Sequence, residues 1–337
     1  MPEEKQYLSA STLKTLEKCS WQHWCKKHLK LPDKNNDGAR RGTICHALLE
    51  YLQNERHRAN YNRIIEADSV NGDAACQRLV ERHFVIADMD DKSEDNLQLV
   101  KDMLMIGLKY DFFCEEDGGE LGNAEEDFLI ENEDPPYIIK GYIDKNAVYD
   151  KGKTLKIIDY KTSKSKFSKS DLESERQAMM YTLAAKSPWG RKKWPKAKKV
   201  VFNFLFLKPD LQKNGPIQEV QFSEDAIKGF EAYISSVFML INDFTEEKAK
   251  ANFAKTNGNH WICGPAKSGW ICPYNLPFDY YVLLDKDSSI LQTSRKKKDL
   301  KAAKGQKIEK RSYSGCPAIH GESHGGDKRE NYDPFDF

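Results

Sequence analysis

The sequence predicts an α/β protein with a helical N-terminal part and a disordered C-terminal tail. Apolar residues at helical spacing dominate about the first 120 residues. Short apolar runs bounded by turn residues then alternate with helical stretches up to about residue 250. From Asp285 onward the chain is rich in Lys, Ser and Gly and poor in large apolar residues, a composition that does not build a core.

The N-terminal part is expected to contain four helices. Ser9 or Ser11 is placed to cap the first helix, because serine oxygens accept the free backbone N–H groups of a first turn. The polar stretch 33–41 is expected to be a loop between the first and second helices. The expected helices cover residues 12–29, 42–52, 73–88 and 94–114.

The middle of the chain changes from helical spacing to strand-like runs. Two turn segments, 132–136 and 150–153, separate the first three of these runs. Ser223 is placed to cap a long helix that ends near residue 248. The expected strands are 128–130, 137–148, 154–160, 199–207 and 217–222, with a further helix over 172–185.

Composition and charge limit the kind of protein. Of the 337 residues, 39% are hydrophobic and 31% are charged, and no run approaches the roughly 18 apolar residues of a membrane-spanning helix. The polar, acidic N-terminus lacks the features of a secretory signal, so we expect a cytoplasmic protein without membrane contact. The net charge is +1, but basic clusters at 191–193, 196–199 and 295–311 oppose an acidic stretch at 115–134. This division suits a basic face for a phosphate backbone and equally suits solvated helix faces.

Two carboxylates and a lysine form the first candidate site. Asp144 ends the run Gly141-Tyr142-Ile143-Asp144, and Asp159 follows about fifteen residues later in Ile158-Asp159-Tyr160-Lys161. If the two runs pair as a hairpin, the two acids converge, and their repulsion favours a shared cation such as Mg²⁺ or Mn²⁺. Lys161 lies two residues after Asp159 and therefore on the same strand face. Such a set is suited to phosphodiester hydrolysis.

Further motifs occur in a fixed order around these residues. Gly42 and His46 stand in Gly42-Thr43-Ile44-Cys45-His46 upstream, and Gln177 and Tyr181 stand four residues apart downstream. This order, together with Asp159-Tyr160-Lys161-Thr162, resembles the PD-(D/E)xK nuclease superfamily, in particular its RecB-type exonuclease branch of phages and bacteria. The resemblance spans roughly residues 7–275.

The resemblance implies a fold and a set of roles. It implies a restriction-endonuclease-like core, a mixed central sheet flanked by helices, acting on DNA. The metal ligands would be His46, Asp144, Asp159 and the Tyr160 carbonyl, and Lys161 would be the catalytic lysine. Gln177 and Tyr181 would hold the substrate phosphate or orient Lys161. Glu50 and Glu126 stay open as additional site residues or as ordinary surface carboxylates.

The predicted domain organisation follows from this resemblance. Residues 1–285 would form one nuclease domain, with a helical part to about 120, a catalytic core over about 121–250 and a cysteine-containing closing segment at 251–285. Residues 286–337 would form a basic, largely disordered tail.

Eight cysteines in a chain expected to be cytoplasmic argue against a disulfide framework. Many members of the resembled branch hold an iron–sulfur cluster with one early and three late cysteines. Cys19, Cys263 and Cys272 fit three of these positions, but Ser268 stands where the middle late cysteine would be. Cys25, His260 or Cys316 would have to supply the fourth ligand, and the spacing selects none of them. The alternative is a clasp without metal. A zinc site at Cys316, His320 and His324 is not favoured, because it offers only three ligands.

The last residues combine acids with aromatic side chains. The segment Asp333-Pro334-Phe335-Asp336-Phe337 loosely resembles the acidic tail of single-stranded-DNA-binding proteins. It would dock on a single-stranded-DNA-binding protein or a recombinase, or it is a disordered end without a partner.

The expected function is a Mg²⁺- or Mn²⁺-dependent DNA exonuclease in DNA end processing, recombination or repair. The alternatives are a structure-specific endonuclease and a non-catalytic DNA-binding subunit of a recombination complex. The presence of Asp144, Asp159 and Lys161 weighs against the non-catalytic alternative.

Overall fold

The computed structural model describes residues 6–33, 37–87, 89, 94–116, 118–265 and 271–320. Two compact units emerge from the pattern of contacts. The first unit comprises residues 1–13 and 35–243, and the second comprises residues 14–34 and 244–337. Each unit therefore combines an N-terminal piece with a later part of the chain.

The helical part of the first unit agrees with the sequence prediction, with one addition and one correction: the second predicted helix begins at Asp37, inside the stretch 33–41 that was expected to be a loop. The predicted helices at 42–52, 73–88 and 94–114 correspond to α3 (Asp37–Gln53), α5 (Ala74–Ile86) and α6 (Glu94–Lys109). The additional helix is α4 (Arg58–Glu66). Asp73 caps α5 by accepting hydrogen bonds from the backbone N–H groups of Ala75 and Cys76 at 3.0 and 2.9 Å.

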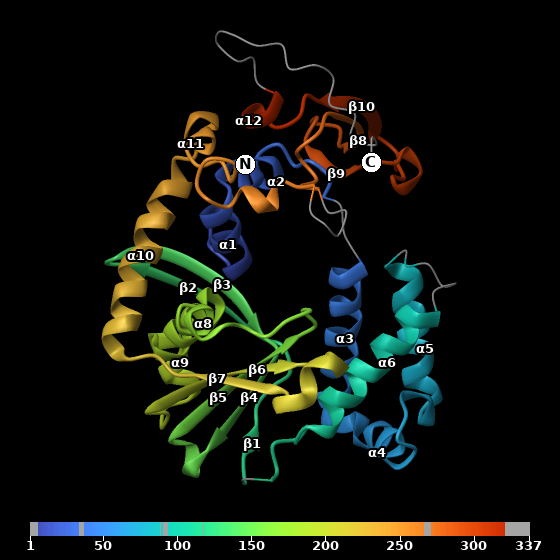
Figure 1. Ribbon diagram of the computed structural model, residues 1–337, viewed down its shortest axis with the longest axis vertical. Coiled ribbons are helices and arrows are strands. Elements are labelled where there is room, and N and C mark those ends of the chain that lie inside the picture. Colours follow the sequence, from blue (N-terminus) through green and yellow to red (C-terminus); the bar gives the residue numbers. More distant parts are fainter. Residues whose placement is uncertain are drawn as a thin grey trace. The chain divides into compact units, whose positions relative to one another are not determined.

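A mixed five-stranded sheet forms the centre of the first unit. Its strand order is β1-β4-β5-β6-β7. All neighbours pair antiparallel except β5 and β6, which are parallel and are joined through helices. The strands are β1 (Glu120–Leu121), β4 (Lys145–Tyr149), β5 (Thr154–Lys161), β6 (Lys199–Phe206) and β7 (Ile217–Val220). This mixed sheet flanked by helices is consistent with the predicted restriction-endonuclease-like core (Figure 1).

The predicted strand 137–148 is in fact two strands in two sheets. β3 (Pro136–Ile143) pairs with β2 (Glu126–Glu133) in a separate two-stranded sheet, and the chain then enters β4 of the central sheet. Asp144 is the single residue between β3 and β4. The expected pairing is thus confirmed for β4 and β5 but wrong for the first half of the run, because β3 finds its partner in β2.

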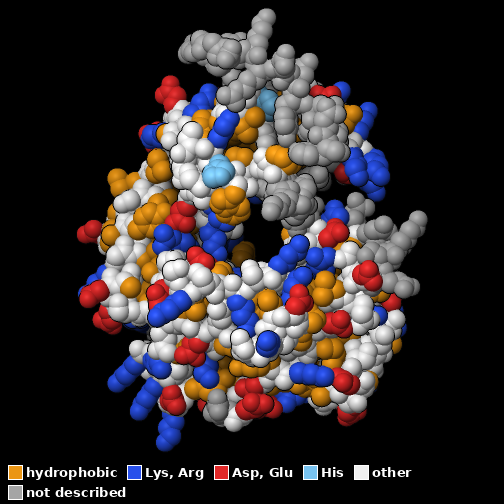
Figure 2. Space-filling model, viewed as in Figure 1, with side chains coloured by type: hydrophobic (Ala, Val, Ile, Leu, Met, Phe, Trp, Pro, Cys, Tyr) orange, Lys and Arg blue, Asp and Glu red, His pale blue; other side chains and the backbone are white. Residues whose placement is uncertain are grey.

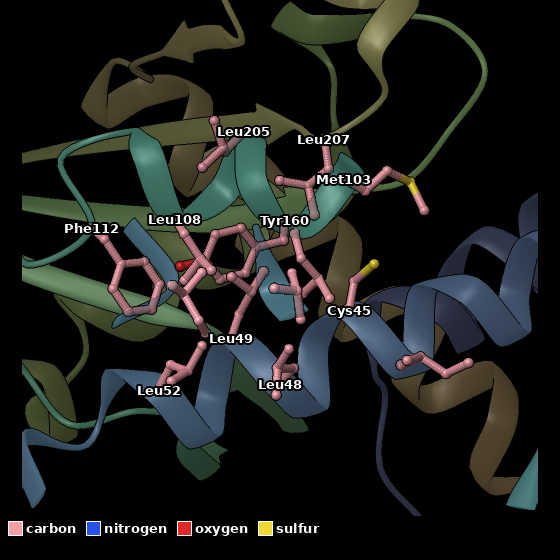
Figure 3. Packing of buried hydrophobic residues seen from close by; sticks show 14 of the residues in the cluster. Cys45, Leu48, Leu49, Leu52, Met103, Leu108, Phe112, Tyr160, Leu205 and Leu207 are labelled. Carbon is pink, nitrogen blue, oxygen red and sulfur yellow. The ribbon is translucent and has the colours of Figure 1, made fainter. Parts of the chain in front are cut away.

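One face of the central sheet packs on the N-terminal helices. Figure 3 shows Leu48, Leu49 and Leu52 of α3 and Met103 and Leu108 of α6 meeting Tyr160, Leu205 and Leu207. All of these side chains are buried. Removal of this apolar surface from water stabilises the association, at about 25 cal/mol per Å² of buried area.

The other face of the sheet is covered by α8 (Arg176–Lys186). Tyr181 of α8 contacts Phe202 of β6 with ring centroids 5.9 Å apart. Every residue of α8 from Ala178 to Ala185 is buried. The helix is flanked in sequence by α7 (Lys169–Glu173) and α9 (Pro188–Lys193). α10 (Glu224–Asn242) packs against α8 and β3 (Figure 1).

Two predicted helices are each interrupted by a short break. Residues 12–29 form α1 (Ala10–Lys18) and α2 (Ser20–Lys27), which are separated at Cys19 in an extended conformation. The long helix after Ser223 ends at Asn242, and Thr245 caps a new helix, α11 (Glu246–Lys250), by accepting from the N–H of Lys248 at 3.2 Å. In both cases the helical spacing of the sequence continues across the break, and a side-chain cap is present only at the second break, at Thr245.

The second unit contains a three-stranded antiparallel sheet of order β10-β8-β9. Its strands are β8 (Phe278–Leu284), β9 (Ile290–Ser294) and β10 (Lys307–Tyr313). A short helix, α12 (Pro317–His320), follows.

The prediction of a disordered tail from residue 286 is wrong for β9 and β10. The buried hydroxyl of Tyr313 accepts a hydrogen bond from Trp21 Nε1 at 2.9 Å and donates to the carbonyl of Tyr274 at 3.2 Å. Lys310 on β10 forms an ion pair with Asp279. A strand with a solvated basic face therefore resembles disordered chain in composition, while a few inward residues hold it in place. The segment Asp333–Phe337 lies outside the described residues.

The basic clusters are distributed over the surface with acids between them. On the face shown in Figure 2, Lys and Arg side chains lie among Asp and Glu side chains. Lys193 of the cluster 191–193 forms an ion pair with Glu126, and the guanidinium of Arg295 stacks 3.6 Å from the ring centroid of Phe278. In the described part of the chain, no helix has the length and apolar character needed to cross a membrane.

Candidate active site

Three segments of the first unit bring the predicted site residues together. His46 lies on α3, Asp144 lies between β3 and β4, and Asp159 and Lys161 lie on β5. Lys145 pairs with Ile158 across the antiparallel β4–β5 ladder. Asp144 and Asp159 are the next residues along these two strands, so the ladder brings the two carboxylates to the same end of the sheet.

The alternation of β5 places the predicted catalytic side chains on one face of the strand and Tyr160 on the other. Asp159 and Lys161 face α8, whereas Tyr160 points into the core formed with α3 and α6 (Figure 3). Tyr160 therefore contributes its backbone to the site and its ring to the packing. The backbone N–H of Tyr160 donates to Asp144 Oδ2 at 3.0 Å, which fixes that carboxylate.

His46 contacts two of the groups predicted to bind the same ion. Its Nδ1 lies 3.2 Å from Asp144 Oδ1, and its Nε2 lies 3.1 Å from the carbonyl oxygen of Tyr160. The close approach of α3 to the end of β5 depends on Gly42, which lies one turn before His46. A Cβ at this position would lie 3.0 Å from Thr162 Oγ1, just past the end of β5. The glycine of this motif thus allows the helix to approach the strand closely.

A second network joins β5 to α8. Lys161 Nζ lies 2.6 Å from Asp159 Oδ2 and donates to Gln177 Oε1 at 2.7 Å. The amide of Gln177 in turn donates to Asp159 Oδ1 at 2.5 Å. The side chain of Asp159 is only 4% exposed, so this ion pair is largely shielded from solvent. Gln177 therefore holds the acid and the lysine at a fixed separation.

Gly141 explains the close packing of α8 on the first acidic motif. A Cβ at Gly141 would lie 2.5 Å from Phe128 Cζ and 2.9 Å from Tyr181 Cε1. The rings of Phe128 and Tyr181 meet edge to face at 5.3 Å. The Tyr181 hydroxyl accepts from Gln177 at a long 3.4 Å. Tyr181 thus supports Gln177 and fills the space that the glycine leaves.

The local electrostatics balance two carboxylates with two cations. Burial raises the pKa of Asp159, and nearby Lys161 opposes this shift. Burial acts to lower the pKa of His46, but the hydrogen bond and charge of Asp144 outweigh it and raise the value to about 9. Burial also acts to lower the pKa of Lys161, and Asp159 raises it above its ordinary value. Without metal, a protonated imidazole and an ammonium therefore accompany the two acids.

The donor set fits a hard divalent cation. His46, Asp144, Asp159 and the Tyr160 carbonyl would supply one nitrogen and several oxygen donors to such an ion, and oxygen donors suit Mg²⁺ or Mn²⁺. Within the described ranges, no three His, Cys, Asp or Glu side chains are arranged to hold one ion. The carboxylates of Asp144 and Asp159 instead contact His46 and Lys161, respectively.

The two open glutamates have different surroundings, and a third one was missed. Glu126 forms an ion pair with Lys193 and accepts from Asn123 at 3.2 Å. Glu50 lines a cavity of about 810 Å³, and Ala47, the residue after His46 in the sequence, lines it as well. The missed residue is Glu125, whose pKa is raised by burial, by Glu50 and by Asp144. Sequence reasoning chose its neighbour, because strand alternation cannot identify which of two consecutive acids precedes the strand.

The three cysteines predicted for a cluster lie in the second unit. Cys19, Cys263 and Cys272 line one cavity there together with Cys316. All eight cysteines of the chain are free thiols.

The comparisons with known proteins agree with the motif order. A model of the PD-(D/E)XK nuclease superfamily matches residues 7–275. A search of the curated proteins gave no match. Among solved structures, the chain is similar to a candidate exonuclease from Eubacterium rectale, with 9% identity, a TM-score of 0.47, and coverage of 78% of this chain and 90% of that chain. It is also similar to the protein SSO0001, with 13% identity, a TM-score of 0.25, and coverage of 67% and 87%.

The family assignment rests on the superfamily model, because both structural matches have low identity and TM-scores below 0.5. The matched region contains His46, Asp144, Asp159, Lys161 and Gln177, which the fold brings into contact. The chain therefore belongs to the PD-(D/E)XK nuclease superfamily.

Proposed function

We propose that this nuclease is a Mg²⁺- or Mn²⁺-dependent deoxyribonuclease of the RecB-type branch that removes nucleotides from DNA ends during end processing, recombination or repair. One observation carries the proposal. His46, Asp144, Asp159, Lys161 and Gln177 form a continuous chain of contacts across α3, β5 and α8. Two of its members are acids that need a cation, and one is a lysine on the same face as Asp159.

The metal ligands would be His46, Asp144, Asp159 and the carbonyl of Tyr160. When bound, a divalent ion polarises a phosphoryl oxygen and lowers the pKa of a coordinated water. The His46 side chain is 31% exposed and that of Asp144 is 14% exposed, whereas Asp159 is almost fully buried. Solvent and substrate therefore reach the site from the His46 side.

Lys161 would stabilise the charge that develops on the phosphoryl group. Its raised pKa keeps the ammonium protonated at neutral pH, so it acts through its positive charge and not as a general base. The ammonium also lies 5.3 Å from the ring centroid of Phe204, which provides an apolar wall on one side. Charge stabilisation is stronger in such a partly dry site than in water.

Gln177 would position Lys161 and leave the phosphate to other groups. Its amide oxygen accepts from Lys161 and its amide nitrogen donates to Asp159, so both ends are already in use. The cavity lined by Ala47 and Glu50 of α3 would offer room for the nucleotide beyond the cleaved bond, with Tyr51 and Arg56 also in its lining.

The function is tested with end-labelled linear DNA and covalently closed circular DNA of the same sequence. Each is incubated with the protein in Mg²⁺, in Mn²⁺ or in EDTA. Degradation of the linear DNA alone, abolished by EDTA, supports a metal-dependent exonuclease. Cleavage of the closed circle supports the structure-specific endonuclease instead. DNA binding without cleavage in either metal favours the non-catalytic DNA-binding subunit.

The C-terminal segment Asp333–Phe337 is proposed to bind a single-stranded-DNA-binding protein or a recombinase. The support is its sequence of acids and aromatic residues. Loss of binding to such a partner in a chain truncated after Asn331, with nuclease activity on naked DNA unchanged, would support it.

A further inference from the structure

Five cysteines of the second unit lie near one another, but they differ in what they face. Cys19, Cys263, Cys272 and Cys316 line a single cavity. Cys25 does not line it, and its sulfur lies 3.6 Å from the hydroxyl of Tyr313 in the buried interior. The exposed His260 does not line the cavity either. The structure thus distinguishes Cys316 from the two other residues that sequence spacing left open.

Backbone hydrogen bonds hold three of the four cysteines around Asn275. The N–H of Cys272 donates to the carbonyl of Cys263 at 3.1 Å, and the side-chain amide of Asn275 donates to the same carbonyl at 3.0 Å. The N–H of Cys316 donates to the carbonyl of Asn275 at 3.0 Å. Cys316 therefore belongs to the same hydrogen-bonded framework as the two late cysteines, although it follows them by more than 40 residues.

The turn that delivers Cys316 requires a glycine. Gly315 has φ +93°, a conformation that other residues rarely adopt. A Cβ at this position would also lie 2.8 Å from His320 Cδ2 and 3.1 Å from Pro277 Cδ. Gly315 places Cys316 directly before α12, where Cys316 lines the cavity. On the N-terminal side, Cys19 lies in an extended conformation between α1 and α2 and lines the same cavity.

The four cysteines that line this cavity form a soft ligand set, and cysteine thiolates prefer zinc, copper or iron–sulfur centres.

The surroundings of these cysteines suit a polynuclear centre. The four cysteines surround a cavity whose exposed atoms are apolar. Iron–sulfur clusters are held in this manner by four cysteine thiolates.

We propose that Cys19, Cys263, Cys272 and Cys316 hold an iron–sulfur cluster, with Cys316 as the fourth ligand. Cys316 lies beyond residues 7–275, the region that the superfamily model matches. It takes the role of the middle late cysteine, whose expected position is occupied by Ser268. The cluster links the start of the chain to residues almost 300 positions later, which restricts the unfolded chain strongly.

The proposal is tested by metal analysis of the full chain, produced in iron-replete cells and purified without oxygen. Iron and acid-labile sulfide are measured per chain for the wild type, Cys316→Ala and the matched control Cys25→Ala. Both substituted cysteines are in the second unit, and neither is part of the proposed catalytic site. Visible absorption and electron paramagnetic resonance spectra, recorded before and after reduction, identify the cluster independently of activity.

The wild type and Cys25→Ala are expected to contain iron and sulfide in similar amounts, and Cys316→Ala is expected to lose most of both. Far-ultraviolet circular dichroism shows whether Cys316→Ala remains folded, and native alkylation then shows whether Cys19, Cys263 and Cys272 have become reactive. Zinc alone or no metal in the anaerobic wild type would overturn the proposal. Retention of iron by folded Cys316→Ala, or equal loss in Cys25→Ala, would overturn it as well.

Discussion

Lys161 shows how one side chain acquires its role from its partners. The ammonium is mostly buried, which alone would favour the neutral amine. The carboxylate of Asp159 at 2.6 Å and the amide oxygen of Gln177 at 2.7 Å reverse that preference. A buried lysine without these partners would lose its charge, and with it the ability to stabilise a phosphoryl oxyanion.

Replacement of Gln177 tests whether it positions Lys161 or binds substrate. We expect Gln177→Leu to lower kcat by about 10- to 100-fold, as is typical when a residue that orients an active-site ligand is lost. The KM for DNA should change little, because no phosphate contact is removed. Steady-state kinetics measure both, and Gln221→Leu provides a control at an exposed glutamine. A rise in KM with unchanged kcat would assign Gln177 to substrate binding.

Single residues were predictable where a local pattern fixes their direction. Asp159 and Lys161 share a strand face, and Gln177 and Tyr181 share a helix face, so spacing alone placed each pair. The sequence did not single out Glu125 or Cys316, and there is a physical reason in each case. The first depends on which of two adjacent acids lies near Glu50 and Asp144, and the second on a long-range contact that no local pattern encodes.

The packing of α8 against β2 and β3 is the element-scale feature that positions Gln177. Gly141→Ala would force a methyl group against Phe128 and Tyr181, and we expect a loss of about 1–3 kcal/mol in the free energy of unfolding. Nuclease activity should fall as well, because α8 carries Gln177. Urea denaturation and cleavage rates measure the two effects.

A double substitution checks the cause of this loss. If the clash with Phe128 is responsible, Phe128→Leu should cost less free energy of unfolding in the Gly141→Ala background than in the wild type. Equal costs in both backgrounds would show that the two residues do not interact.

The free energy of unfolding of the second unit is expected to depend on pH through His23 of α2. Burial, with contributions from His28 and Lys27, lowers the pKa of His23 from 6.5 to about 4. As the pH falls below 6.5, the unfolded chain takes up this proton before the folded chain does. Neutral His23 makes its full contribution to the free energy of unfolding above pH 6.5. This contribution is at most roughly 3 kcal/mol and is lost as the pH falls to about 4.

His23→Phe should remove this part of the pH dependence while retaining the edge-to-face contact with Phe244. Urea midpoints between pH 4.5 and 7.5 measure the slope, with exposed His260→Phe as the control. An unchanged slope in His23→Phe, or the same flattening in His260→Phe, would contradict the assignment.

At the scale of the whole molecule, the sequence predicted the class of fold better than its division into units. Helical spacing and apolar runs located most elements of the first unit. The break at Asp144 was not predictable, because β3 and β4 form one continuous strand pattern and differ only in their partners. The strands β9 and β10 were missed because their outward faces are charged and only a few residues, such as Tyr313, are buried.

The division into two units also depends on contacts between residues that lie far apart in the sequence. The second unit joins residues 14–34 to the last part of the chain, and hydrogen bonds such as Trp21 to Tyr313 carry this association. The single domain predicted over 1–285 was based on the family resemblance. That resemblance ends near residue 275 and therefore does not include β10.

The network around Lys161 is proposed to be the catalytic site of this nuclease. Lys161→Met keeps most of the side-chain volume and removes the charge, and Lys164→Met makes the same change at an exposed position three residues away. The direct measurement is the initial rate of Mg²⁺-dependent cleavage of linear DNA, compared at equal DNA binding. We predict that Lys161→Met is slower by about 100- to 1,000-fold, as expected when a group that stabilises the transition-state charge is lost, while Lys164→Met matches the wild type. A Lys161→Met protein that cleaves at the wild-type rate would contradict the account.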